Sequence, residues 1–92
     1  MIAVIGASGR SGAALCRALA AAGRAFAPVA RDARKWRALG LPGTPRLARL
    51  EDAASLREAL AGADRVVSCA HARWAPAVLA AAPPGARLVL MG

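Results

Sequence analysis

The chain has 92 residues and a formal net charge of +8, which is enough for one domain with a modest core. Alanine supplies much of the 58% hydrophobic content, and we find neither the roughly 20-residue apolar run of a membrane span nor a signal-peptide layout, so we expect a soluble, cytoplasmic protein. The arginines are spread along the whole chain rather than gathered in a basic tail, which favours solvated surface over nucleic-acid binding.

The opening stretch runs from a short apolar strand, Ile2–Ile5, into three evenly spaced glycines. We interpret it as a phosphate-binding turn, because the helix that follows points unpaired N–H groups and its positive dipole end at the strand tip. Gly6 would form the tight turn, Gly9 would admit a pyrophosphate against bare backbone, and Gly12 would let the helix lie close to the strand. The predicted phosphate site consists of Gly6, Ser8, Gly9, Arg10, Ser11 and Gly12. The alternative is an ordinary strand-to-helix turn without a ligand.

The helix after this turn is predicted from its periodicity. It begins at about Arg10 and extends over Ala13–Ala22, with Leu15, Leu19 and Ala22 on one face. A glycine directly after it is a natural left-handed cap.

The second strand and helix are predicted next. The strand covers Arg24–Ala30, although Pro28 asks for an irregular or partly unpaired stretch there. Asp32 is placed to cap a helix over Ala33–Leu39, in which Trp36 would face the sheet.

The second half of the chain contributes five further predicted elements. These are a short edge strand over Arg46–Leu50, a helix over Asp52–Gly62 capped by its first residue, a buried strand over Val66–Ala70, a helix over Arg73–Ala82 with Pro76 in its first turn, and a strand over Arg87–Met91. Strands that alternate with helices indicate a parallel sheet with right-handed crossovers. The glycine turn after the first strand favours the doubly wound α/β fold, with five strands in the order 3-2-1-4-5 and helices on both faces.

The cysteines do not suggest a metal or redox site. Cys16 and Cys69 lie far apart in the sequence and accompany a single histidine, His71, without a C-x-x-C motif. We therefore expect buried free thiols and no metal ion.

Three blocks of sequence then resemble a known family. The glycine turn at 6–12, Val29–Lys35, and Asp52–Leu56 with Ala59–Asp64 are similar to the N-terminal half of the atypical short-chain dehydrogenase/reductases, the NmrA-like and NAD(P)H-binding group. The resemblance covers nearly the whole chain. It implies a Rossmann domain over residues 1–92 with NADP(H) or NAD(H) as its ligand, and an oxidoreductase, epimerase or redox-sensing role for the complete proteins.

The charge at the end of the second strand bears on the choice of dinucleotide. An acidic residue there would accept hydrogen bonds from a ribose 2′-OH, whereas an arginine would meet a 2′-phosphate. Arg31 takes this position and Arg10 can reach the same corner, so NADP(H) is predicted, with NAD(H) as the alternative. Arg34 and Lys35 would either add positive charge near the 2′-phosphate or remain solvated. Asp32 could serve a 2′-OH, but capping the following helix is its simpler role.

The chain also departs from the family pattern. Ala48 and Arg49 stand where relatives carry a Gly-Asp pair beside the adenine, which leaves the Leu50 backbone as the candidate contact. By the resemblance, the residues that follow the fourth strand lie near the nicotinamide; they are Cys69, Ala70 and His71. For the histidine, simple exposure in a loop is the alternative interpretation.

The catalytic residues of the family are not expected in this chain. In the complete relatives a Ser/Thr and a Tyr-x-x-x-Lys pair follow the fifth strand, whereas this sequence contains no tyrosine and a single lysine, Lys35. We therefore predict a cofactor-binding part, truncated before the catalytic and substrate-binding regions. The alternative is a free-standing module without catalysis, either a dinucleotide sensor or a basic nucleic-acid-binding protein. The substrate and the oligomeric state are not predicted.

Overall fold

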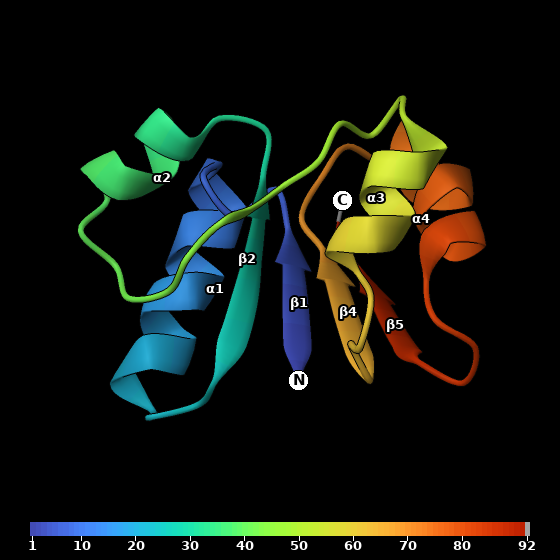
Figure 1. The fold of residues 1–92 in the computed structure, drawn as a ribbon. Coiled ribbons are helices and arrows are strands. Elements are labelled where there is room, and N and C mark those ends of the chain that lie inside the picture. Colours follow the sequence, from blue (N-terminus) through green and yellow to red (C-terminus); the bar gives the residue numbers. More distant parts are fainter. Residues whose placement is uncertain (92) are drawn as a thin grey trace.

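The computed structural model describes residues 1–91 and confirms the predicted architecture (Figure 1). Five parallel strands form one sheet in the order β3-β2-β1-β4-β5. The strands are β1 Ile2–Ile5, β2 Phe26–Ala30, β3 Arg46–Leu47, β4 Arg65–Ser68 and β5 Arg87–Leu90. The helices are α1 Arg10–Ala21, α2 Ala33–Ala38, α3 Ala53–Ala59 and α4 Ala75–Ala81, the last preceded by the 3₁₀ turn η1 Ala72–Trp74.

Helices cover both faces of the sheet, α1 and α2 on one side and α3 and α4 on the other (Figure 1). Alternate residues of β1 enter the two resulting cores, because successive side chains of a strand point to opposite faces. Ala3 and Ile5 pack with the α3 and α4 side chains, whereas Val4 packs with Cys16 and Trp36. Each core is assembled from small apolar residues around a few large ones, which suits an alanine-rich chain of this length.

The predicted face of α1 is confirmed in part, since Leu15 and Leu19 pack against the core that contains Cys16, whereas Ala22 is exposed. The buried residues of this helix are Gly12, Ala13 and Cys16, whereas Leu15 and Leu19 are only partly buried. The reason is the close approach of the helix to the glycine turn, which leaves room for small side chains only. The leucines lie at the margin of the core instead.

Several other boundaries differ from the predicted ones, among them the start of β2 at Phe26 and the end of α3 at Ala59. β3 ends at Leu47 because the next backbone is taken up by the start of α3, where the Arg49 N–H donates to Ser55 Oγ at 3.1 Å. β4 ends at Ser68 because its neighbour β1 ends in the glycine turn. The single helix predicted over 73–82 is a 3₁₀ turn followed by α4, with Pro76 in the first turn of α4, where its missing N–H is tolerated.

Pro28 lies inside a regular strand and is fully buried. It pairs with Val4 of β1, whereas β3 pairs with β2 only at Val29 and Ala30. The Ala30 carbonyl points toward β3, where it accepts from the Ala48 N–H at 3.2 Å. Residues two apart in a strand point the same way, so the missing N–H of Pro28 faces a part of the edge that β3 does not reach.

Candidate functional site

The glycine turn lies at the carboxyl end of β1 and is fastened to β2. The N–H groups of Gly6 and Ala7 both donate to the Val29 carbonyl, at 3.1 and 3.2 Å. Gly6 has a φ of +74°, which favours glycine. A Cβ placed on Gly12 would lie 2.0 Å from the Gly6 carbonyl oxygen, so no other residue fits there without displacing the turn.

The start of α1 presents free hydrogen-bond donors beside this turn. The N-cap residue Gly9 has no side chain to accept from the first turn of the helix. Among residues 1–91, the backbone N–H groups of Arg10, Ser11 and Gly12 have no acceptor. Arg10 and Ser11 are exposed, while Ser8 is half-buried. Such a group of donors at the positive end of a helix dipole is suited to an anion.

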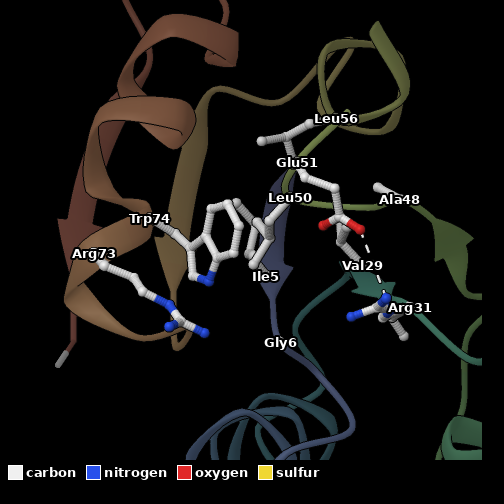
Figure 2. A pocket seen from close by; sticks show the side chains of 11 residues that line it. Ile5, Gly6, Val29, Arg31, Ala48, Leu50, Glu51, Leu56, Arg73 and Trp74 are labelled. Carbon is white, nitrogen blue, oxygen red and sulfur yellow. Dashed lines mark ion pairs between the residues drawn. The ribbon is translucent and has the colours of Figure 1, made fainter. Parts of the chain in front are cut away.

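A cavity of about 160 Å³ opens next to the turn, over the carboxyl ends of β1 and β2 (Figure 2). Its lining comes from four separate parts of the chain. The end of β1 contributes Ile5 and Gly6, and the end of β2 contributes Val29, Ala30 and Arg31. The segment from β3 to α3 contributes Ala48, Leu50, Glu51 and Leu56, and the segment after β4 contributes Arg73 and Trp74. We call this space the base cavity. Leu50, predicted as an adenine contact, therefore lies beside Gly6 and Arg31.

The walls of the base cavity differ in chemistry. Figure 2 shows Arg31 and Glu51 on one side, with Arg73 and Trp74 pointing in from the opposite side. Arg31 Nη2 lies 3.6 Å from Glu51 Oε1 in an exposed ion pair. The remaining lining is mostly apolar. The space therefore suits a flat group with a polar edge.

A second, open hollow of about 630 Å³ lies against the same Arg31 and is lined by four basic side chains. We call it the cationic hollow. It is lined by Ser8, Arg31, Asp32, Ala33, Arg34, Lys35, Leu47 and Arg49. Its one carboxylate, that of Asp32, caps α2 by accepting from the Arg34 N–H at 2.8 Å, as predicted. The lining therefore holds four cations, and its single carboxylate is already engaged in the helix cap.

The residues after β4 border two different parts of the molecule, the glycine turn and a separate small hollow. The backbone of Cys69 and Ala70 lies about 3.4 Å from the position that a Cβ on Gly6 would take. Ala70 and His71 line a separate hollow of about 100 Å³. The exposed His71 caps η1, with Nδ1 accepting from the Arg73 N–H at 3.0 Å. Burial raises the pKa of the half-buried Cys69 thiol.

Sequence reasoning missed Glu51, Arg73 and Trp74. Glu51 directly follows Leu50, and a carboxylate two positions after the family's aspartate was the available signal. Trp74 was placed in a helix, where an indole is as readily explained by packing. The 3₁₀ turn brings it to the carboxyl edge of the sheet instead.

Two further findings concern the part of the chain that the structure describes. No helix within residues 1–91 is long and apolar enough to cross a bilayer. The same residues contain no group of three or more His, Cys, Asp or Glu side chains able to hold a metal ion.

Comparison with solved structures gives close matches in fold. An NADPH-dependent quinone oxidoreductase of Escherichia coli, solved with NADPH, is 27% identical, with a TM-score of 0.81 over 98% of this chain and 36% of its own. A short-chain dehydrogenase/reductase superfamily protein of Agrobacterium tumefaciens, solved with NAD, is 25% identical, with a TM-score of 0.72 over 98% of this chain and 31% of its own. The triphenylmethane reductase of Citrobacter sp., complexed with NADP(H), has the same fold at 21% identity, with a TM-score of 0.79 over 100% of this chain and 37% of its own.

The chain spans about a third of the length of these three structures. No curated protein sequence matches it. The family model described as NAD(P)H-binding matches residues 6–89, a range that includes the glycine turn, the cationic hollow and all of the base-cavity lining except Ile5. The chain belongs to the NAD(P)H-binding family and has its Rossmann fold, as its sequence blocks predicted.

Proposed function

We propose that the chain binds NADP(H) in preference to NAD(H) and serves as the cofactor-binding part of an NAD(P)-dependent oxidoreductase or epimerase. The observation that carries this proposal is the position of Arg31, which lines both the base cavity and the cationic hollow. Two of the solved proteins, at 27% and 25% identity, were solved with NADPH and NAD respectively. The family therefore leaves the choice open, and the charges of this chain favour NADP(H).

The diphosphate would rest on the glycine turn. The free N–H groups at the start of α1 offer hydrogen bonds to its oxygens, and the helix dipole adds a favourable potential. Gly9 leaves the approach open because it has no side chain. Arg10 is exposed at the same helix end and supplies a further cation.

The 2′-phosphate would enter the cationic hollow. This phosphate is carried by the adenosine ribose, so it must lie near the base, and Arg31 is the residue that the two spaces share. A guanidinium binds phosphate through two parallel hydrogen bonds, which an uncharged 2′-OH cannot match. Arg34, Lys35 and Arg49 line the same hollow and add to the favourable potential.

The nicotinamide would extend toward the segment after β4. Cys69 and Ala70 lie beside Gly6 at the carboxyl edge of the sheet, at the side away from Arg31. The bound cofactor would supply hydride transfer, while this chain orients it. The chain spans about a third of the length of the solved proteins it resembles, which supports a cofactor-binding part.

Calorimetric titration with NADPH and NADH tests the proposal. We expect Arg31→Ala to weaken NADPH binding by about tenfold or more, as for the loss of a charge-assisted hydrogen bond, and to change NADH binding by less than about twofold. Arg57→Ala, an exposed arginine on α3, is the matched control and should leave both affinities unchanged. Equal losses for the two dinucleotides would exclude the 2′-phosphate role. Binding of neither dinucleotide by the unsubstituted chain would overturn the proposed function.

A further inference from the structure

Trp74 lines the base cavity from the end of a short 3₁₀ turn. It ends the 3₁₀ turn η1, and its backbone N–H donates to the His71 carbonyl at 2.9 Å. The His71 side chain caps the same turn through the Arg73 N–H. The guanidinium of Arg73 lies 5.4 Å from the centre of the Trp74 ring, within the range of a cation–π contact. The backbone of the turn is therefore held by two hydrogen bonds, and the Arg73 guanidinium flanks the indole ring.

The indole is nevertheless half-buried rather than sealed in the core. It lines the cavity together with the apolar side chains Ile5, Leu50 and Leu56. Figure 2 shows the ring pointing into the space from the side opposite Arg31 and Glu51. The other tryptophan of the chain, Trp36, is fully buried on the opposite face of the sheet and donates to the Gly43 carbonyl at 3.0 Å. Only one of the two indoles thus faces this cavity.

We propose that Trp74 is a cofactor-binding residue that stacks on the adenine base of the bound dinucleotide. This inference rests on the proposed function. A purine has apolar faces and a polar edge, which matches an aromatic wall facing an Arg–Glu pair across an apolar floor. Adenine rather than nicotinamide occupies this space because Arg31 borders it, and the phosphate that Arg31 recognises belongs to the adenosine ribose.

Stacking on Trp74 has a specific consequence for ligand fragments. Adenosine 2′,5′-bisphosphate contains the base and the 2′-phosphate, so it engages both Trp74 and Arg31. Nicotinamide mononucleotide contains neither group. The first fragment therefore quenches Trp74 fluorescence as it binds, whereas the second leaves the fluorescence unchanged.

Two substitutions separate stacking from simple packing. Trp74→Phe keeps an aromatic face and Trp74→Leu keeps an apolar side chain without one. We expect Trp74→Leu to weaken binding of adenosine 2′,5′-bisphosphate and of NADPH by about tenfold or more, the usual loss when an aromatic platform under a base is removed. Trp74→Phe should retain affinity within about threefold, yet lose the fluorescence quenching. Leu79→Ala, an exposed position on the neighbouring α4, is the control for loss of an apolar side chain.

The outcomes distinguish this inference from the proposed function. Unchanged affinity in Trp74→Leu, or quenching that persists in Trp74→Phe, would overturn the stacking role while NADPH binding itself stood. Failure of the unsubstituted chain to bind any dinucleotide would overturn both. Trp36 emission and circular dichroism report whether each variant keeps the fold, so a loss of affinity in a folded Trp74→Leu protein supports stacking.

Discussion

The guanidinium of Arg31 lies 3.6 Å from the carboxylate of Glu51, between the base cavity and the cationic hollow. Both side chains are exposed, by 71% and 47%. Solvent therefore screens the pair, and its contribution to stability is small. Its importance lies in competition, because a 2′-phosphate must share Arg31 with Glu51 or displace it.

We accordingly expect Glu51→Gln to strengthen NADPH binding by about two- to fivefold, the range of an exposed charge interaction. NADH binding should change less, because no phosphate meets Arg31 in that complex. The gain should shrink at high salt, where exposed charges are screened. Titration of both dinucleotides at two ionic strengths measures the effect, with Glu58→Gln on α3 as the control. A larger gain for NADH would contradict this view of the pair.

Replacement of Gly12 by alanine tests the packing of the turn. Alanine in a helix ordinarily stabilises relative to glycine by roughly 0.5–1 kcal/mol. Here the added Cβ would lie 2.0 Å from the Gly6 carbonyl oxygen, so we expect a loss of about 2 kcal/mol or more in the free energy of unfolding. Urea denaturation gives the value. Gly9→Ala is the matched control, because its Cβ would lie 3.3 Å from the same oxygen. A Gly12→Ala protein as stable as the unsubstituted chain would refute the close approach.

The sheet order was predictable because several local signals agreed. Five short strands alternate with helices, and the glycine turn selects the doubly wound arrangement. The caps at Asp32 and Asp52 lie where the sequence indicated. Each of these features depends on a residue and its near neighbours, which a single sequence contains.

The features that escaped prediction depend on contacts between distant segments. Gly12 approaches Gly6 closely, so the small residues of α1 form its fully buried face, while Leu15 and Leu19 pack at the margin of the core. Trp74 lies beside Leu50 and Ile5 only because η1 follows β4 at the carboxyl edge. Side-chain periodicity describes one element at a time, and it has no information about which loop ends face the same cavity.

Arg49 offers a test of the cationic hollow that is independent of Arg31. It lines the hollow and is exposed. We expect Arg49→Ala to weaken NADPH binding by about two- to fivefold at low salt and to leave NADH binding unchanged, because a partly screened cation contributes less than a bidentate one. Arg24→Ala, an exposed arginine between α1 and β2, is the control. Equal effects of the two substitutions would indicate general surface charge rather than a phosphate site.

The two thiols are expected to differ in reactivity, because the thiolate is the form that reacts. Cys16 is fully buried. Its burial and, to a lesser extent, the charge of the neighbouring Cys69 raise its pKa to about 11. The pKa of Cys69 is also raised by burial, but this thiol is half-buried and lies beside the glycine turn.

Alkylation followed by mass spectrometry at mildly alkaline pH should therefore modify Cys69 first, and Cys16 only as the chain unfolds. Because the folded-state pKa of Cys16 exceeds its ordinary value of 9.0, its contribution to stability is complete below pH 9 and is lost as the pH rises toward 11. NADPH should slow the modification of Cys69, since the dinucleotide would lie against the turn that Cys69 borders. Cys69→Ser supplies the control in which the early modification disappears. Rapid alkylation of Cys16 in the folded Cys69→Ser protein would show that α1 opens from the sheet far more readily than its packing implies.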